Sequence, residues 1–568
     1  MRGVDMRRLS LLVFSVLAAC AARNEPEPAL MPAPETTRAI AQGTLTGFRS
    51  PEGVNVWLGV PFAAPPVGDL RWRAPRPAQP WDGVLNALSH GPRCAQMTNR
   101  YDRPEGLTPG NPIGSEDCLT LNVYAPDKAD NLPVMFWIHG GGNVWGHASS
   151  YHPQNLAVNE NVLVVTVQYR VGPFGWFAHE ALRDSAEVPL DRSANFGIMD
   201  QIAALEWVRD NIAIFGGDAS RVTIFGESAG GHNVASLLAA PAAKGLFHRA
   251  ILQSGSFDSF PADEAENGSE KTVNSASEIA ARLGAKTAAD LHALAMEDIL
   301  QAYNFSEFGF LNLPTIIADD PLIPTPTLRE AFDDPATFNA VPIMTGTNRD
   351  EMKLSQALDP RLVHNYFNLV IWPKRNGFYN ALSDYQSRLW RLRSVDGPAE
   401  RMAAGGHVEV YGYRFDWDDA GRLLLTDLKN LMGAAHSMEI PFVFNRFEFF
   451  GDVDRVVFQK KTAADREALS RAMGSYWADF ARTGDPNGDG RPSWPVYTSG
   501  NRAQLLRFDT QNDGGIAILE GVETADLILA DLKEDKRIND KERCIIAGAL
   551  IDWAPSFEDR VRAVLPCR

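Results

Sequence analysis

A single serine lies between two glycines in the stretch VTIFGESAGGHNVASLL, residues 222–238. Its G-x-S-x-G motif occupies residues 226–230 and centres on Ser228. A serine hydroxyl is a weak nucleophile at neutral pH, so catalysis by Ser228 would require a base and an acidic group that orients the base. The alternative is that Ser228 is only a small residue in a tight turn, because five residues of this kind also arise by chance.

The residues around the motif favour the nucleophile. An apolar run at 222–225 precedes it and a segment with alanines and leucines at helical spacing follows it, which is the strand, sharp turn and helix of a nucleophile elbow. We expect Ser228 to have a strained backbone with an exposed hydroxyl, and the glycines to be required because side chains there would collide across the turn. The following helix N-terminus favours developing negative charge.

The partners of such a serine follow it in the chain. His436 lies between a Gly/Ala loop and an apolar run. His364 could equally be an ordinary packed residue of a helix as a catalytic base. For the acid, an apolar run ending near residue 348 leads into a polar loop with Asp350 and Glu351, and spacing does not choose between them. The histidines beyond the elbow that we consider as bases are His248, His292, His364, His407 and His436.

A run of glycines upstream supplies a candidate oxyanion hole. Gly140, Gly141 and Gly142 follow the apolar segment VMFWIH, and glycines let backbone N–H groups face an oxyanion without obstruction. The alternative is a merely flexible glycine loop. That alternative does not explain why the glycine run and the G-x-S-x-G elbow occur together and in the expected order. Aromatic residues could line a pocket, although each alone is more often a core residue: Trp145, Phe257, Phe260, Phe308 and Phe310.

Short apolar runs alternate with helical segments along most of the 568 residues. We expect strands in TLNVYAP, VMFWIHG, VLVVTVQYR, RVTIFGES, AILQSGS and VPIMTGT, separated by segments such as DQIAALEWVRDNIAIFG. This alternation predicts an α/β fold with a large, mostly parallel central sheet and helices on both faces. We assign one domain to residues 39–568, with a helical insertion near residues 268–301.

The N-terminus has the pattern of an export signal. Residues 1–19 combine a positive region with a short apolar run, which is typical of a signal peptide and too short to span a bilayer. Leu17-Ala18-Ala19-Cys20 resembles the bacterial lipobox, which predicts lipidation of Cys20 and a Pro/Ala/Glu-rich tether at residues 20–38. We therefore expect an exported cell-envelope lipoprotein, periplasmic or anchored in the outer membrane, and a secreted protein if Cys20 is not lipidated.

The cysteines other than Cys20 indicate disulfide bonds. An even number of cysteines in an oxidising compartment suggests two disulfides, and proximity favours Cys94 with Cys118 and Cys544 with Cys567. The other pairings and free buried thiols stay open.

The formal net charge of -17 gives no basic patch for a phosphate backbone, so we expect no nucleic-acid partner. Membrane attachment would come only through the lipid anchor.

The chain resembles the type-B carboxylesterases, the family of cholinesterase-like and para-nitrobenzyl-type esterases. FGGDASRVTIFGESAG at 215–230 and EDCLTLNVYAP at 116–126 carry the resemblance, and weaker matches extend over nearly the whole mature chain. The resemblance implies an α/β-hydrolase fold with helical insertions above the carboxyl ends of the strands. It also implies that Ser228 is the nucleophile, His436 the base and Glu351 the orienting acid.

The same resemblance implies an oxyanion hole from the N–H groups of Gly141, Gly142 and Ala229, and a disulfide between Cys94 and Cys118. It implies a small-molecule ester substrate and no metal or cofactor. The chain departs from the family at residues 352–353, which are Met and Lys where many relatives have glycine, and this puts the local loop conformation in question. The alternatives are a catalytically silent binding or adhesion lipoprotein and an amidase with the same triad; the sequence predicts neither the physiological ester nor the oligomeric state.

Overall fold

The computed structural model describes residues 30–565 and 567, apart from 271, 307–308, 319, 367–369 and 501–503. The predicted signal peptide and Cys20 lie outside these residues. Within the described part, no helix is both long enough and apolar enough to cross a membrane.

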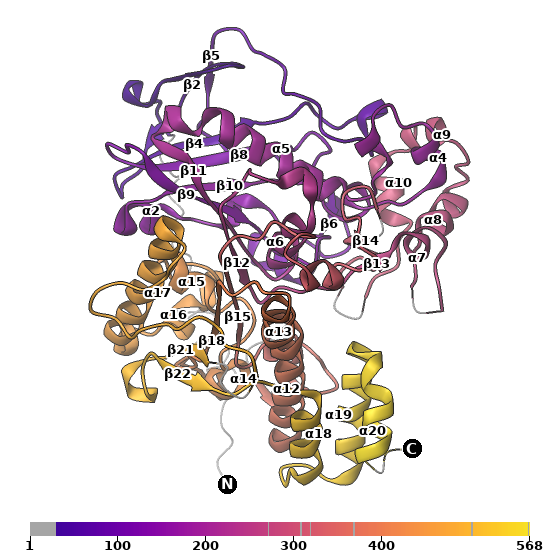
Figure 1. Ribbon diagram of the computed structural model, residues 1–568, viewed down its shortest axis with the longest axis vertical. Coiled ribbons are helices and arrows are strands. Elements are labelled where there is room, and N and C mark those ends of the chain that lie inside the picture. The colour runs from indigo at the N-terminus through magenta and orange to yellow at the C-terminus, as the bar shows by residue number, and fades with distance from the viewer. Residues whose placement is uncertain are drawn as a thin grey trace, which may run out of the picture.

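An eleven-stranded sheet forms the centre of the molecule (Figure 1). Its middle strands are parallel to one another, and antiparallel strands complete both edges. This confirms the predicted α/β fold and its mostly parallel sheet. In spatial order the strands are β22 (Ala517–Glu520), β21 (Gln504–Phe508), β18 (Val410–Phe415), β15 (Ile343–Asn348), β12 (Arg249–Gln253), β11 (Gly217–Glu227), β9 (Leu132–Ile138), β10 (Leu163–Val167), β8 (Thr120–Pro126), β4 (Val54–Pro61) and β3 (Phe48–Arg49).

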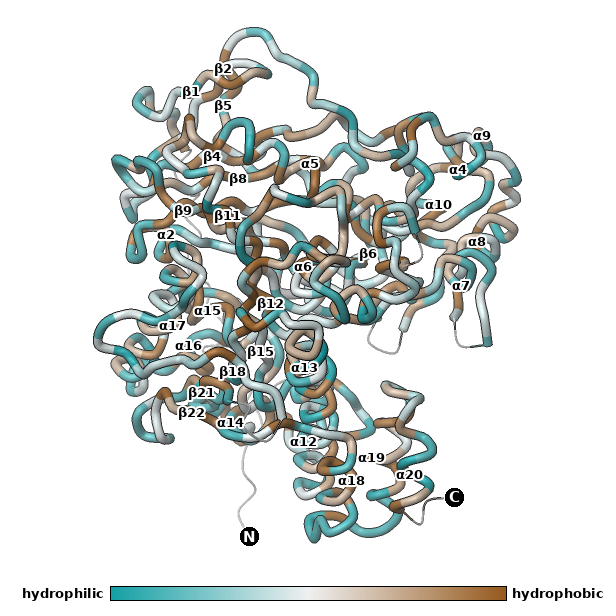
Figure 2. The backbone as a smooth tube through the Cα atoms, in the orientation of Figure 1, coloured by the Kyte–Doolittle hydropathy of each residue, from teal (hydrophilic) through white to brown (hydrophobic). Residues whose placement is uncertain are grey.

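Helices cover both faces of this sheet. Alternate residues of one strand enter different cores, because side chains point to opposite faces with a period of two. In β9, Phe136 joins the core on one face and Trp137 the core on the other. One face packs against α5 (Phe196–Asn211) and α6 (Ala229–Ala239), and the other against α2 (Gln154–Glu160), α15 (Ile440–Val443) and α17 (Ala463–Thr483). Figure 2 shows hydrophobic residues along the central strands.

The expected helical insertion is present as four short helices at one side of the molecule. They are α7 (Ala262–Asn267), α8 (Ala276–Leu283), α9 (Ala288–His292) and α10 (Met296–Gln301). A long helix, α12 (Asn376–Arg391), continues through a π-helical turn at Leu392–Asp396 into α13 (Gly397–Ala404).

The folded body begins earlier than the predicted boundary at residue 39. Pro34–Thr36 forms a 3-10 helix, and Thr36 is completely buried. The indole Nε1 of Trp57 donates to the Thr36 carbonyl at 2.8 Å. The end of the predicted tether is therefore packed against Trp57 of β4.

Three helices close the chain: α18 (Ala525–Glu534), α19 (Asp540–Trp553) and α20 (Glu558–Val564). We call them the C-terminal helical unit, and Figure 1 shows them beside α12. They share a small core with α12, which includes Leu389, Leu532 and Leu550. The disulfide Cys544–Cys567 links α19 to the end of the chain, and Cys94–Cys118 is the second disulfide. Both are the pairings that proximity in sequence favoured.

Candidate active site

Ser228 lies at a sharp turn between β11 and α6. Its backbone has φ 58° and ψ -122°, a left-handed conformation that costs a non-glycine residue about 1–3 kcal/mol. The Ser228 N–H donates to the Gln253 carbonyl at 2.9 Å, and the Ser228 carbonyl accepts the His232 N–H at 3.0 Å. Ser228 borders a cavity of about 220 Å³. The expected strained backbone and accessible position of this serine are both present.

The two glycines of the motif are required by close backbone contacts. A Cβ atom at Gly226 would lie 2.6 Å from the carbonyl carbon of Gly230, and one at Gly230 would lie 2.0 Å from the Ile138 carbonyl oxygen. Side chains at these positions would therefore push the turn away from β9. This confirms the expectation that residues two positions either side of the serine must be glycine.

His436 and Glu351 are in direct contact. The Glu351 carboxylate follows β15, and its Oε2 lies 2.6 Å from His436 Nδ1. Its Oε1 accepts three further hydrogen bonds, from the hydroxyls of Ser254 and Thr347 and the backbone N–H of Asn348, at 2.6–2.7 Å. Burial alone would raise the pKa of Glu351, but the charge of His436 and these hydrogen bonds outweigh it and lower the pKa. Glu351 is thus a fully bonded, ionised carboxylate.

Asp350, the other candidate acid, faces different partners. Its carboxylate pairs with Arg349 at 2.7 Å and with Lys353 at 3.1 Å, and it accepts the backbone N–H of Ala434. The structure therefore separates two acids that spacing could not. Lys353 is held by the Asp350 carboxylate, while Glu351 keeps its contact with His436.

The other candidate histidines lie in different surroundings. His248 accepts the backbone N–H of Val222, and His407 packs edge-on against Phe338. The His364 ring contacts that of Trp372 in a tilted arrangement, on an exposed hairpin of β16 (Val363–Tyr366) and β17 (Val370–Pro373). The helix considered for His364 is thus a strand, because Val363–Tyr366 pairs with Val370–Pro373 in an antiparallel hairpin.

Two further buried glutamates surround His436. Glu227, the residue before Ser228, has its Oε1 at 3.1 Å from His436 Nε2 and accepts the Ser437 hydroxyl at 2.7 Å. Glu439 accepts hydrogen bonds from Asn348 and Gln253. Neither residue is indicated by the sequence, because Glu227 is a variable position of the G-x-S-x-G motif and Glu439 lies in an apolar run.

These carboxylates determine the charge state of the site. Burial raises the pKa of Glu227 and of Glu439, although the neighbouring His436 opposes both rises. Burial would lower the pKa of His436, but the charges of Glu227 and Glu351 and the Glu351 hydrogen bond outweigh it and raise the pKa. The imidazolium form is therefore stabilised at this position, and the cluster exchanges protons as a coupled group.

The glycine loop after β9 lies beside the serine. Gly141 and Gly142 have φ of 107° and 63°, conformations that favour glycine. A Cβ atom at Gly141 would lie 2.0 Å from the Trp145 carbonyl oxygen. Gly142 and Ala229 border the same cavity as Ser228. The backbone of this loop thus passes close to the serine without side chains between them.

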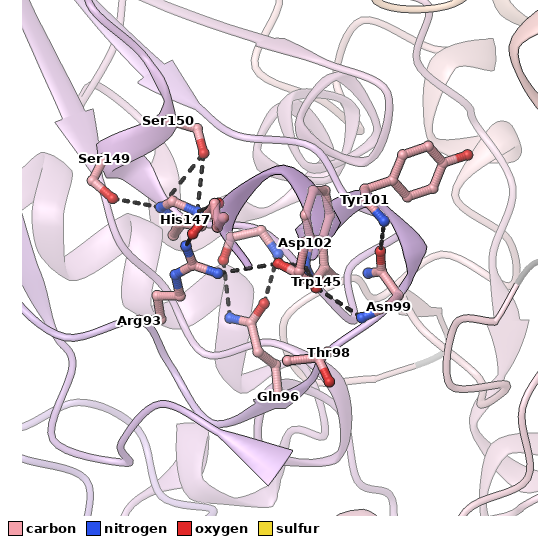
Figure 3. A network of polar contacts seen from close by, with 12 residues as sticks. Arg93, Gln96, Thr98, Asn99, Tyr101, Asp102, Trp145, His147, Ser149 and Ser150 are labelled. Carbon is pink, nitrogen blue, oxygen red and sulfur yellow. Dashed lines mark hydrogen bonds and ion pairs between the residues drawn. The ribbon is translucent and has the colours of Figure 1, made fainter. Parts of the chain in front are cut away.

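A buried polar network holds the end of this loop (Figure 3). Gln96, which is fully buried, both donates to the Gly146 carbonyl and accepts the Gly146 N–H at 3.0 Å. The Asp102 carboxylate accepts the Trp145 indole N–H at 3.0 Å and pairs with Arg93 at 3.1 Å. Gln96 and Asp102 both belong to the segment closed by the Cys94–Cys118 disulfide. That segment therefore fixes the glycine loop.

Two tryptophans that no sequence pattern indicates border the cavity. Trp390 is the second-to-last residue of α12 and Trp553 the last residue of α19, and both line the cavity together with Ser228 and Arg393. Of the aromatic residues considered from the sequence, Phe257 packs in the core against Phe332, and Phe308 lies outside the described residues.

Comparison with known proteins gives a consistent result. Residues 34–370 and 373–525 match the profile of the carboxylesterase family. Carboxylesterase 5A of Felis catus is 36% identical over 514 residues, covering 82% of this chain and 88% of that protein. The para-nitrobenzyl esterase of Bacillus subtilis is 34% identical over 474 residues, covering 80% and 91%.

Solved structures show the same similarity. A thermophilic PNB esterase superposes with a TM-score of 0.68 and 31% identity, covering 85% of this chain and 97% of that one. A carboxylesterase from Geobacillus stearothermophilus superposes with a TM-score of 0.66 and 31% identity, covering 85% and 98%. These neighbours share the α/β-hydrolase fold described above.

The Glu227 carboxylate generates a testable pH dependence. Its charge raises the pKa of His436, and a general base works only when neutral, so activity is lost as the pH falls through that pKa. Glu227→Gln removes the charge and lowers the pKa. We expect the acidic limb of the kcat/KM profile for a nitrophenyl ester to move to lower pH by about one unit.

The matched control is Glu467→Gln, a change of the same kind at an exposed position of α17, which should leave the profile in place. An acidic limb that stays fixed in Glu227→Gln, or moves to higher pH, would show that Glu227 does not govern the charge of His436.

Proposed function

Because this chain belongs to the carboxylesterase family and is a carboxylic-ester hydrolase, we propose that it cleaves small-molecule esters through an acyl-enzyme on Ser228, with His436 as general base and Glu351 as orienting acid. The observation that carries this proposal is the 2.6 Å contact between His436 Nδ1 and Glu351. The other ring nitrogen of His436 lies 3.1 Å from Glu227, the residue that precedes the strained Ser228. A carboxylate on Nδ1 fixes the tautomer that carries its proton on Nδ1 and its lone pair on Nε2.

The reaction proceeds in two acyl transfers. His436 Nε2 takes the Ser228 proton as Oγ attacks the ester carbonyl, and the same nitrogen then donates that proton to the leaving alkoxide. Water, activated by His436, attacks the acyl-enzyme and releases the acid. Nε2 also faces Glu227 at 3.1 Å, so the transient imidazolium has a carboxylate on each of its nitrogens.

The N–H groups of Gly141, Gly142 and Ala229 would stabilise the tetrahedral oxyanion. The positive φ of both glycines and the position of Ala229 at the N-terminus of α6 support this role, because a helix N-terminus presents unpaired N–H groups. One such donor is worth about 2.7–4 kcal/mol in transition-state stabilisation. The mechanism proposed here uses no metal or cofactor.

The nucleophile is tested by Ser228→Ala. We expect this variant to lose para-nitrophenyl acetate turnover by at least about 10⁴-fold, because it lacks the hydroxyl that forms the acyl-enzyme in the proposed mechanism. Ser236→Ala is the matched control: it removes a hydroxyl that bonds to the His232 carbonyl in the same helix and should retain activity. Activity near the wild-type level in a folded Ser228→Ala protein would contradict the assignment.

Two alternatives make different predictions in simple assays. A catalytically silent binding or adhesion protein would leave Ser228 unlabelled by a fluorophosphonate probe. An amidase with the same triad would hydrolyse para-nitroacetanilide at a rate comparable to that of para-nitrophenyl acetate. The buried and fully bonded Glu351 favours the active hydrolase over the silent protein, because a binding function does not require it.

We also propose that the protein is exported and lipidated at Cys20, with residues 1–19 as the signal peptide. The sequence motif supports this proposal, and two disulfide bonds are typical of an oxidising compartment.

Export and lipidation are tested in cells grown with radiolabelled palmitate. We expect the wild-type protein to carry the label and to sediment with membranes, and Cys20→Ala to lose both properties, because the thiol is the site of acylation. An unlabelled wild-type protein would contradict lipidation, and a protein confined to the cytosol would contradict export.

A further inference from the structure

Two tryptophans from distant parts of the chain meet beside the catalytic histidine. The Trp390 ring centroid lies 4.9 Å from that of His436, at an interplanar angle of 41°. The Trp553 ring lies 5.2 Å from Trp390 at 77°, an edge-to-face contact. Both indoles are partly exposed and border the cavity that contains Ser228. The imidazole and the two indoles therefore form a continuous wall on one side of the site.

A set of ion pairs holds Trp553 in this position. Arg393, in the π-helical turn after α12, donates to the Trp553 carbonyl and pairs with Asp258 at 2.6 Å. Arg329 binds the other oxygen of Asp258 at 2.6 Å. Asp258 follows β12, so the end of α19 is tied to the segment that lies next to the serine. A π-turn within a helix is frequent at functional sites, and here it directs Arg393 into the cavity.

The C-terminal helical unit also holds Trp553 in place. Trp553 is the last residue of α19, in the C-terminal helical unit, whose core packs against α12, the helix that ends near Trp390. The family profile matches this chain to residue 525, so Trp553 lies beyond the region that the profile matches. The unit brings an aromatic side chain to the cavity from outside the matched region.

The position of this wall beside His436 indicates which half of the ester it contacts. In the proposed mechanism His436 Nε2 donates its proton to the leaving alkoxide oxygen, so the alcohol group must lie against the imidazole at that step. Trp390 borders the imidazole directly and Trp553 extends the same wall. The acyl group, in contrast, remains on Ser228 after the alcohol leaves.

We propose that Trp390 and Trp553 form the binding subsite for the alcohol half of the ester, and that this subsite favours esters of aromatic alcohols over those of aliphatic alcohols. The inference rests on the proposed function of His436 and Ser228. Aromatic pairs gain from stacked or edge-to-face arrangements beyond the area that they bury. Trp553 is thus a specificity-determining residue, and the acyl group is selected elsewhere.

The test compares two ester series on the full-length protein. In the first, the acyl group is acetyl and the alcohol is benzyl, cyclohexylmethyl or butyl; in the second, butyl esters carry acetyl, butanoyl or hexanoyl groups. We expect wild type to prefer benzyl acetate by kcat/KM. Trp553→Leu should lower the benzyl-to-butyl ratio about two- to tenfold and leave the acyl series unchanged within about twofold, whereas Trp553→Phe should retain most of the benzyl preference.

Trp372→Leu is the matched control, because it removes an exposed tryptophan of β17 that contacts His364 and Tyr366 of β16, and it should change neither series. Equal losses for all alcohols in Trp553→Leu, or a change confined to the acyl series, would overturn the proposal. Failure of wild type to hydrolyse any ester would instead overturn the proposed function.

A second measurement needs no variant. Benzyl alcohol and cyclohexylmethanol differ mainly in aromaticity, and each should compete for the alcohol subsite. We expect benzyl alcohol to inhibit butyl acetate hydrolysis by the wild-type enzyme at a concentration several-fold lower than cyclohexylmethanol does. Equal inhibition by the two alcohols would contradict an aromatic subsite even if Trp553→Leu failed to fold.

Discussion

The strained backbone at Ser228 is the constraint on which the rest of the site depends. A serine at φ 58° persists only when its surroundings leave the chain no alternative. Here β11 is paired on both sides by parallel strands, β9 and β12, and Gly230 packs against the Ile138 carbonyl of β9. The helix α6 is buried along nearly its whole length, so it cannot move outward to relax the turn.

The same sheet gathers the other groups at one edge. The carboxyl ends of neighbouring parallel strands lie side by side, so residues that follow different strands meet there. The glycine loop follows β9, Ser228 follows β11, and Glu351 follows β15. Gln253, at the end of β12, accepts the Ser228 N–H and donates to Glu439. The order of the strands therefore accounts for a site whose members are far apart in sequence.

Electrostatics then differentiate the acidic groups. Glu351 has hydrogen bonds on both oxygens and a lowered pKa, whereas burial raises the pKa of Glu227 and of Glu439. The imidazole of His436 lies among these three glutamates. Its charged form is stabilised while the glutamates need not all be ionised, so His436 can take up a proton and release it again. Burial is the main cause of the raised pKa values of Glu227 and Glu439, and like-charge repulsion among the three buried carboxylates adds to it.

Much of this arrangement was predictable from local sequence. The strands around Ser228 are continuous apolar runs, and the elbow needs glycine at fixed positions, so both leave clear patterns. The choice between Asp350 and Glu351 was not available from spacing, because it depends on Arg349 and Lys353 binding the first of them.

Contacts between distant segments left no local pattern. Trp390 and Trp553 meet only because the C-terminal helical unit packs on α12, and neither sequence neighbourhood signals that contact. The packing of Pro34–Thr36 likewise depends on Trp57. The local composition, rich in proline and alanine, predicts a tether and gives no sign of that contact.

The most direct test of the whole account is a crystal structure of the enzyme after reaction with a para-nitrophenyl alkylphosphonate. We predict that the phosphorus is bonded to Ser228 Oγ and that its oxygen lies about 2.7–3.1 Å from the backbone nitrogens of Gly141, Gly142 and Ala229. An adduct on another residue, or a phosphoryl oxygen pointing away from these three N–H groups, would contradict the account.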